Sequence, residues 1–139
     1  MMAMNLAEIP LFQMLRGRLS HLTERQKVIA QNVANADTPG YVPQDVGPFG
    51  FRTRLQASAA MAATQPGHMQ PKNARSPSAA AYKARETASS ETTLNGNAVV
   101  LEEEMMKMAE ARINYDAAIG YYQKSLGILR LATKPAGRA

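Results

Sequence analysis

The sequence predicts a mostly α-helical protein, in which two long terminal helices pair as an antiparallel coiled-coil-like hairpin around an extended arm and a loop-rich middle segment. Two observations predict this fold class. The eight prolines leave two long proline-free runs, 11 to 38 and 78 to 134, and a proline inside a helix costs about 3 kcal/mol. Both runs also carry apolar residues at alternating steps of three and four, the spacing of a coiled-coil seam.

The length of 139 residues leaves room for one core at most. We therefore expect three parts along the chain. Residues 1–38 form an N-terminal helix that closes with an end motif, residues 39–94 form the extended arm and a low-complexity loop, and residues 95–139 form the C-terminal helix.

The seam of the first helix contains one polar interruption, Gln26, and the seam of the second contains another, Arg112. Each can fix the register as a polar layer, or can extend its long side chain out of an imperfect seam. The predicted seam of the first helix is Phe12, Leu15, Leu19, Leu22, Gln26, Ile29, Val33 and Ala36. That of the second is Leu101, Met105, Met108, Arg112, Tyr115, Ile119, Tyr122, Leu126, Leu129 and Thr133.

Charges at the two ends of the second helix favour its formation independently of the seam. Glu102, Glu103 and Glu104 occupy its first turns, and Lys124, Arg130 and Lys134 lie towards its end, as the helix dipole prefers. Asn97 is the predicted N-cap, and Gly96 allows the chain to turn just before it.

The flanks of the second seam are apolar or small, where a two-stranded coiled coil usually carries Glu and Lys. A two-helix hairpin covers only one stripe, so the remaining apolar surface needs other neighbours. We expect those neighbours to be other subunits; the alternative is that the middle segment folds back over this surface. The residues predicted for packing between subunits are Met106, Ala111, Ile113, Ala118, Gly120 and Gly127.

Proline and glycine punctuate residues 41–51, which predicts an extended arm or irregular hairpin there rather than regular sheet. Residues 53–93 are rich in Ala, Ser and Thr and poor in large apolar side chains. Such a composition cannot bury much surface, so it predicts a loop, with short helical turns around residues 57–63.

A motif at the end of the first helix is the most informative segment of the chain. It comprises Asn32, Ala34, Asn35, Asp37, Thr38, Pro39, Gly40 and Tyr41. Pro39 and Gly40 occupy the second and third positions of a predicted type II turn, which ends the helix and redirects the chain. Asn32 and Asn35 lie one helical turn apart, and their amides can reach neighbouring backbone groups or the last carbonyls of the helix.

This motif resembles the N-terminal signature shared by the axial proteins of the bacterial flagellum, the rod and hook family. A second resemblance, to the C-terminal pattern of flagellar basal-body rod proteins, is carried by Asn95, Gly96, Asn97, Val99, Glu104, Met105 and Tyr115. Together the two resemblances cover roughly residues 11–51 and 95–134.

The resemblance implies a structural subunit of the proximal rod, which carries torque from the motor through the periplasm towards the hook. It also implies terminal helices that stack helically around an export channel, with other copies, other rod proteins and a rod-to-export-gate adaptor as partners. Export through the flagellar type III apparatus needs no cleaved signal. This fits the first fifteen residues, which do not have the pattern of a secretory signal peptide.

An enzyme is not expected, because the sequence has no cysteine, and its two histidines, His21 and His68, belong to no recognisable catalytic or metal-binding constellation. No cofactor and no small-molecule substrate are expected. The net charge of +5 permits a nucleic-acid partner, and a basic helical binder using Arg16, Arg18, Arg25 and Lys27 is one alternative.

Acidic and basic residues are balanced along the second helix, which argues against a continuous basic surface and so against nucleic-acid binding. A second alternative is a type III secreted needle or translocator protein, which is also a helical hairpin. The turn motif at Pro39 and Gly40 disfavours that interpretation.

Overall fold

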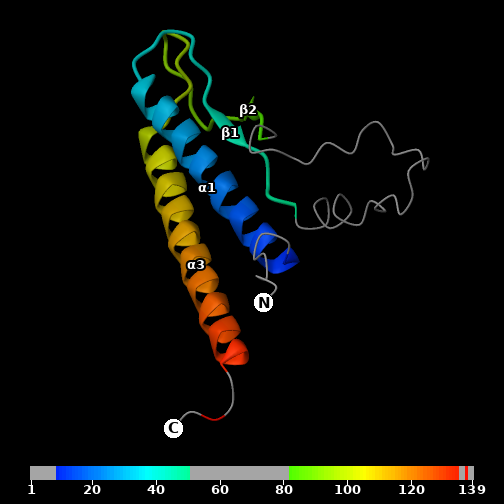
Figure 1. The fold of residues 1–139 in the computed structure, drawn as a ribbon. Coiled ribbons are helices and arrows are strands. Elements are labelled where there is room, and N and C mark those ends of the chain that lie inside the picture. Colours follow the sequence, from blue (N-terminus) through cyan, green and yellow to red (C-terminus); the bar gives the residue numbers. More distant parts are fainter. Residues whose placement is uncertain (1–8, 51–81, 135–136, 138–139) are drawn as a thin grey trace, which may run out of the picture.

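The computed structural model describes residues 9–50, 82–134 and 137. Helix α1 spans Pro10–Ala34 and helix α3 spans Leu101–Thr133. The two helices run antiparallel and side by side, and the chain between them turns at one end of the pair (Figure 1). The predicted helical hairpin is therefore confirmed.

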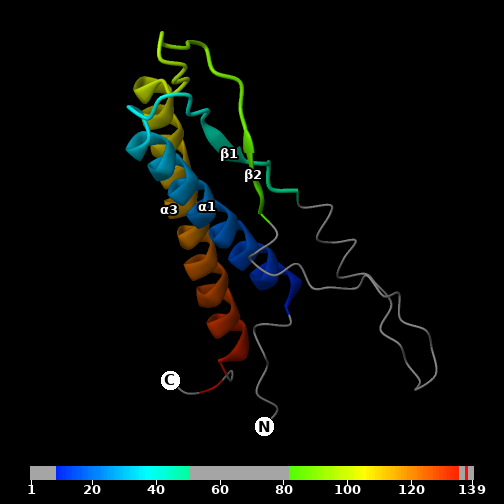
Figure 2. The same cartoon turned by 90° about the horizontal axis from the view of Figure 1, so that it is seen from above.

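A two-stranded antiparallel ribbon lies along α1, on the side away from α3 (Figures 1 and 2). Strand β1, Gln44–Val46, pairs with strand β2, Ala84–Glu86, and Asp45 stands opposite Arg85. The sequence predicted an extended arm at β1 but placed β2 inside a loop. The pairing went unpredicted because each strand has only three residues, too few for an alternating pattern to show. The helical turns predicted around residues 57–63 lie outside the described residues.

The residues in the first turn of each helix are ones that favour a helix start. Pro10 stands at the start of α1, where its missing N–H is not needed. Three glutamates occupy the first turn of α3 and Arg130 its last turn, which matches the helix dipole. The N-cap of α3, however, is Val100, and it makes no side-chain hydrogen bond. Asn97 is therefore not the N-cap that the sequence predicted.

The core lies between the two helices. Phe12 packs edge-on against Tyr122 with ring centroids 5.3 Å apart. Leu15, Leu22 and Ile29 are buried, as the seam of the first helix predicts. Leu19, Met108, Tyr115, Ile119, Tyr122, Leu126 and Leu129 are half-buried.

The predicted seam of α3 is displaced in part: the fully buried Ala111 and Ala118 lie one residue before the predicted Arg112 and Ile119, whereas other seam residues, Tyr122 among them, are half-buried. Leu101 and Met105 are 45% and 68% exposed, whereas Ala111 and Ala118 are 0% and 1% exposed. The two alanines were predicted to contact other subunits, and the structure contradicts this, since α1 already covers them. Small side chains at these two positions let α1 and α3 approach each other closely. The large side chains of α1 then fill the space between the two helices.

The register of α1 is displaced at its C-terminal end as well. Val33 was a predicted seam residue, but it is 40% exposed, and Asn32 is fully buried in its place. The reason is that α1 is covered on two sides, by α3 and by the ribbon, so its buried arc is wider than one seam.

Candidate functional site at the junction of helices and arm

The side chain of Asn32 joins three elements at the end of the hairpin. Its Nδ2 donates to the backbone carbonyl of Gln44 at 2.7 Å, and its Oδ1 accepts from the backbone N–H of Gln44 at 3.0 Å. Nδ2 also donates to Oε2 of Glu104 at 2.8 Å, and Oδ1 accepts from the hydroxyl of Tyr41 at 3.1 Å. Both ends of this amide are therefore used, one residue holding α1, β1 and α3 together.

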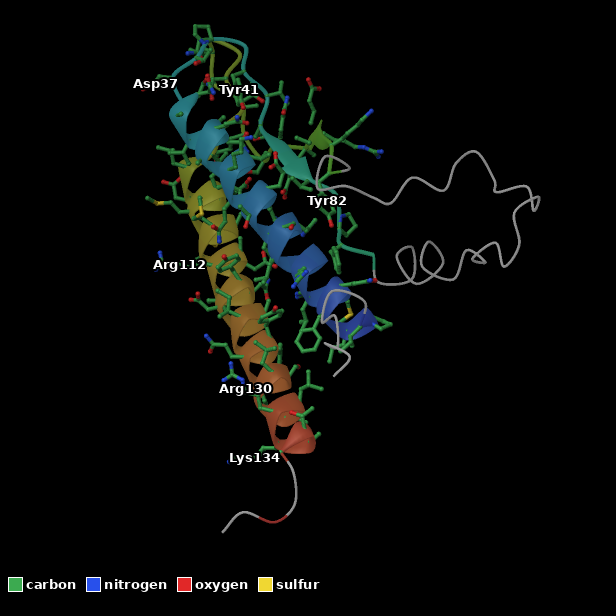
Figure 3. The ribbon with its side chains drawn as sticks, viewed as in Figure 1. Asp37, Tyr41, Tyr82, Arg112, Arg130 and Lys134 are labelled. Atoms are coloured by element: carbon green, nitrogen blue, oxygen red, sulfur yellow. The ribbon has the colours of Figure 1, made fainter. Side chains whose placement is uncertain are left out.

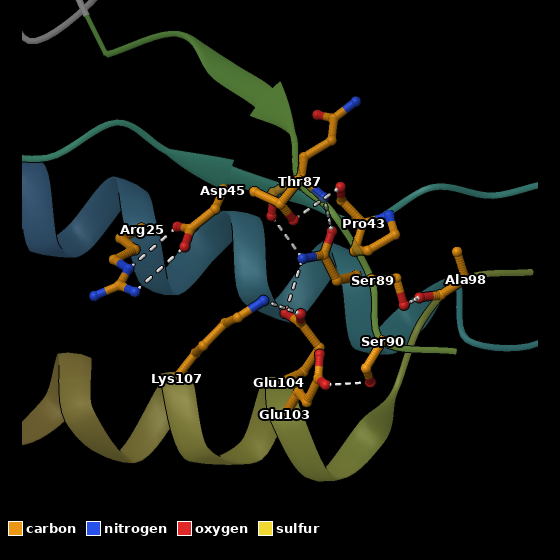
Figure 4. A network of polar contacts seen from close by, with 12 residues as sticks. Arg25, Pro43, Asp45, Thr87, Ser89, Ser90, Ala98, Glu103, Glu104 and Lys107 are labelled. Carbon is orange, nitrogen blue, oxygen red and sulfur yellow. Dashed lines mark hydrogen bonds and ion pairs between the residues drawn. The ribbon is translucent and has the colours of Figure 1, made fainter. Parts of the chain in front are cut away.

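Glu104 is a buried carboxylate at this junction, 1% exposed. Besides the Asn32 amide, it accepts from Nζ of Lys107 at 2.8 Å, one turn further along α3 (Figure 4). A buried charge is tolerated only when it is paired and hydrogen-bonded. The two donors supply both conditions, so the glutamate that the C-terminal resemblance singled out has a structural explanation.

A second ion pair fixes the arm about two turns before Asn32 on α1. Arg25 faces Asp45 of β1 side-on, with Nε to Oδ1 at 3.1 Å and Nη2 to Oδ2 at 3.2 Å (Figure 4). Arg25 also lies 3.7 Å from Glu110 of α3. Because both members of the Arg25–Asp45 pair are largely buried, the pair is a stronger constraint than an exposed surface ion pair.

The far end of the arm closes on an aromatic cluster around His21. The His21 ring lies 2.6 Å from the carbonyl of Gly47 through Nε2, and it packs edge-on against Tyr82 with centroids 5.1 Å apart. The Tyr82 hydroxyl donates to the carbonyl of Gly17 on α1 (Figure 3). His21, predicted to have no catalytic partner, is thus a packing residue between α1 and the arm.

The predicted turn from Thr38 to Tyr41 is present. Gly40 has φ of +73°, as the third position of a type II turn requires, and the N–H of Tyr41 donates to the carbonyl of Thr38 at 3.3 Å. Asn35 Nδ2 donates to the carbonyl of Gln31 at 2.8 Å. Helix α1 itself ends at Ala34, so the residues from Asn35 onwards belong to the turn.

Asn97 caps the end of the first helix rather than the start of the second. It is 3% exposed, and its Nδ2 donates to the carbonyls of Asn35 and Thr38 at 2.9 and 2.7 Å. The backbone N–H of Gly40 donates to the carbonyl of Asn95, and a Cβ on Gly96 would lie 3.4 Å from the Cα of Gly40. The two motifs predicted separately therefore form one site.

Sequence reasoning missed this contact because the motifs are about 60 residues apart and each has a plausible local role. The signal that could have indicated it is the presence of two asparagines, a residue favoured in turns and caps, in each motif. Of the other motif residues, Ala34, Asp37, Pro39 and Met105 are exposed, and Val99 and Tyr115 are half-buried.

The outer face of α3, turned away from α1, remains apolar. Its large exposed side chains are Met106 at 66%, Ile113 at 69%, Tyr121 at 64%, Ile128 at 59% and Leu131 at 71% exposure. A Cβ added at Gly120 or Gly127 would meet nothing within 4 Å. Four of the six residues predicted for packing between subunits, Met106, Ile113, Gly120 and Gly127, lie on this face.

Within the described parts of the chain, no group of three or more His, Asp or Glu side chains could hold a metal ion. Neither α1 nor α3 has the apolar length needed to cross a bilayer. The site consists of structural hydrogen bonds and ion pairs.

A protein with a terminal helical hairpin, a capped turn and an apolar outer face has the form of a subunit in an assembly. A family model described as "Flagella basal body rod protein" matches residues 12–41, which include α1 and the turn. The chain is also 33% identical over 118 residues to the "Flagellar basal body rod protein FlgB" of Agrobacterium fabrum, covering 83% of this chain and 86% of the relative.

The FlgB protein of Bacillus subtilis is 32% identical over 108 residues, covering 77% of this chain and 80% of the relative. The chain therefore belongs to the FlgB family of flagellar basal-body rod proteins. These matches favour the rod family over the nucleic-acid-binding and needle-like alternatives that the sequence raised.

Proposed function

We propose that this chain is a structural subunit of the proximal rod of the flagellar basal body, where it carries torque and has no enzymatic activity. The observation that carries the proposal is the likeness to two rod proteins over most of both chains. The apolar outer face of α3 supports it, because a face with large side chains 59% to 71% exposed is unusual on a protein that works alone.

Its proposed partners are other copies of itself, other rod proteins and the adaptor that joins the rod to the export gate. Met106, Ile113, Gly120 and Gly127 are the residues proposed to contact these neighbours. The junction built on Asn32, Glu104 and Asn97 has a separate role, since it holds the arm and both helices in one arrangement that each neighbour can recognise.

We further propose that the chain reaches the rod through the flagellar type III export apparatus without a cleaved signal, and that the rod places it in the periplasm. Export of this kind passes the chain unfolded.

Deletion of the gene and complementation test the proposal. The deletion strain should lack motility and a complete rod, and the chain should restore both. Purified basal bodies should contain the restored chain with its original N-terminus by mass spectrometry. Motility unaffected by the deletion would refute the rod function, and a shortened N-terminus would refute uncleaved export alone.

A further inference from the structure

The two ends of the helical hairpin carry opposite charges. The turn end, where α1 passes into the arm and α3 begins, comprises residues 28–41 and 88–106. It contains five acidic residues and no lysine or arginine. One of the five, Glu104, is buried and paired with Lys107. The other four form no ion pair with any described residue and make this end negative: Asp37, Glu91, Glu102 and Glu103.

The open end, where α1 begins and α3 ends, is basic. It comprises residues 9–23 and 117–134 and contains no aspartate or glutamate. Figure 3 shows the separation of charge, with Asp37 at one end of the helix pair and Arg130 and Lys134 towards the other. Five basic side chains at the open end are exposed and form no ion pair within the described parts of the chain: Arg16, Arg18, Lys124, Arg130 and Lys134.

Each end also exposes large apolar side chains among its charges. At the turn end, Leu94 is fully exposed, in a turn that the N–H of Gly96 closes on the carbonyl of Thr93 at 2.9 Å. At the open end, Ile128 and Leu131 in the last two turns of α3 are 59% and 71% exposed. An apolar centre with a polar rim is the usual composition of a protein–protein contact.

Hydrogen bonds hold the turn end together as one surface. Ser90 donates to the carboxylate of Glu103, which ties the loop before α3 to the first turn of that helix (Figure 4). The N–H of Gly40 donates to the carbonyl of Asn95 at 3.1 Å, which ties the same loop to the turn after α1. The acidic residues and Leu94 are thus held in place before binding, so little conformational freedom is lost when a partner binds.

We infer that the turn end of one copy binds the open end of a second copy, with Leu94 packed against Ile128 and Leu131 inside a rim of opposite charges. The inference rests on the proposed assembly function and names one contact within it. Opposite charges attract across this contact, whereas two turn ends or two open ends would bring like charges together. The charges therefore select a second copy in head-to-tail orientation.

A head-to-tail contact uses two different surfaces of each copy, so it does not close as a dimer. Every copy that joins leaves one turn end and one open end free for the next. Copies therefore follow one another along the direction of the helices, and the contact weakens as salt screens the exposed charges.

Cross-linking of two single-cysteine variants of the full chain tests the orientation, because the natural chain has no cysteine. Thr92→Cys marks the turn end and Ala132→Cys marks the open end. Both positions are exposed, and both substitutions leave the charges and the apolar side chains in place. One variant is labelled with a heavy nitrogen isotope, so mass spectrometry distinguishes the mixed pair from the two like pairs. A short bismaleimide added to an equimolar mixture should give mainly the mixed pair.

Each cysteine variant alone should give little cross-linked dimer, because like ends repel. A statistical distribution of the three pairs would show random collision and would overturn the inference. An excess of either like pair would show a two-fold contact and would overturn it as well. Absence of any cross-link in the concentrated protein has the same consequence.

Charge reversal at the turn end tests whether the charges select the partner. Glu91→Lys/Glu102→Lys in the Thr92→Cys chain should lower the yield of the mixed pair at least about tenfold, since two attractions become repulsions. The matched control is Glu86→Lys/Asp116→Lys, which reverses two exposed carboxylates outside both ends. The control should leave the yield unchanged, and equal losses for the two variants would refute a contact at the turn end.

Reversal at the open end should then restore the contact. Lys124→Glu/Arg130→Glu in the Ala132→Cys chain should return the mixed pair with the reversed turn end, while circular dichroism shows unchanged helicity. A yield that stays low would refute the pairing of these two ends.

The result is separable from the proposed function, because cross-linking of the purified chain does not depend on motility. No mixed pair, together with a deletion strain that swims again when given the natural chain, would refute the contact and leave the rod function in place. A strong mixed pair with no restored motility would refute the rod function alone.

Discussion

Replacing Asn32 with alanine should destabilise the chain by about 4 kcal/mol, because this one side chain serves three elements. The substitution removes the paired hydrogen bonds to the backbone of Gln44 and the bonds to Glu104 and Tyr41. Asn32 is fully buried, so water does not replace the lost partners without opening the junction.

The magnitude follows from the individual bonds. The two bonds to the Gln44 backbone are neutral and contribute about 1 kcal/mol each, and the bond to the carboxylate of Glu104 contributes about 2 kcal/mol. The Tyr41 hydroxyl is only part-buried, and it can turn to water, so it adds little. The substitution leaves the buried Glu104 with the ammonium group of Lys107 as its donor.

Urea unfolding followed by circular dichroism at 222 nm measures the effect. The matched control is Asn35→Ala, the same change three residues along the chain, where the side chain donates to Gln31 and accepts from Thr38 in exposed bonds. The control should lose at most about 1 kcal/mol. Equal losses for the two variants, or a loss below 1 kcal/mol for Asn32→Ala, would contradict the argument that the junction is held by this amide.

Three further predictions concern the turn, the cap and the arm. Gly40→Ala should lower the free energy of unfolding in urea by about 1 kcal/mol. The positive φ of Gly40 is the cause, since an added Cβ would meet nothing within 4 Å. The control Gly47→Ala should cost less, and the reverse order would refute the turn assignment. Asn97→Ala should lower the free energy of unfolding by about 2 kcal/mol, because the carbonyls of Asn35 and Thr38 lose their donor. Amide hydrogen exchange near residue 40 should also become faster. Unchanged exchange there would count against the cap. Arg25→Ala should remove the ion pair that holds Asp45 of the arm against α1. Amide hydrogen exchange in β1 should then rise about fivefold, while exchange in α3 stays as before. An equal rise in α3 would show a general loss of stability instead.

The helices were predictable from the sequence because proline distribution and apolar periodicity act locally. The turn at Gly40 was predictable for the same reason, since Pro followed by Gly favours one turn type. Helix ends were less well defined, and α1 ends at Ala34, four residues before the predicted limit.

The face of α3 that meets α1 was not predictable from hydrophobicity. The sequence offers two adjacent stripes, one containing Leu101 and Met105 and one containing Ala111 and Ala118, and the larger side chains favour the first. The structure buries the second, because the polar junction fixes the register: Glu104 must face Asn32, and Ala111 and Ala118 lie on the same face at seven-residue intervals. A long-range polar contact has no local signal.

The role of Asn97 was hidden for a related reason. A single asparagine before a helix is a good N-cap, so the local interpretation sufficed. Its actual partners, the carbonyls of Asn35 and Thr38, lie in the other motif. The resemblance to rod proteins identified both motifs, but only the three-dimensional arrangement showed that they form one site.

The most direct test of the rod function is the presence of this chain in basal bodies purified from motile cells. Mass spectrometry of the rod fraction should find the chain, and a deletion strain should yield basal bodies that lack both the chain and the completed rod. Complete rods without the chain, from cells that still swim, would contradict the account.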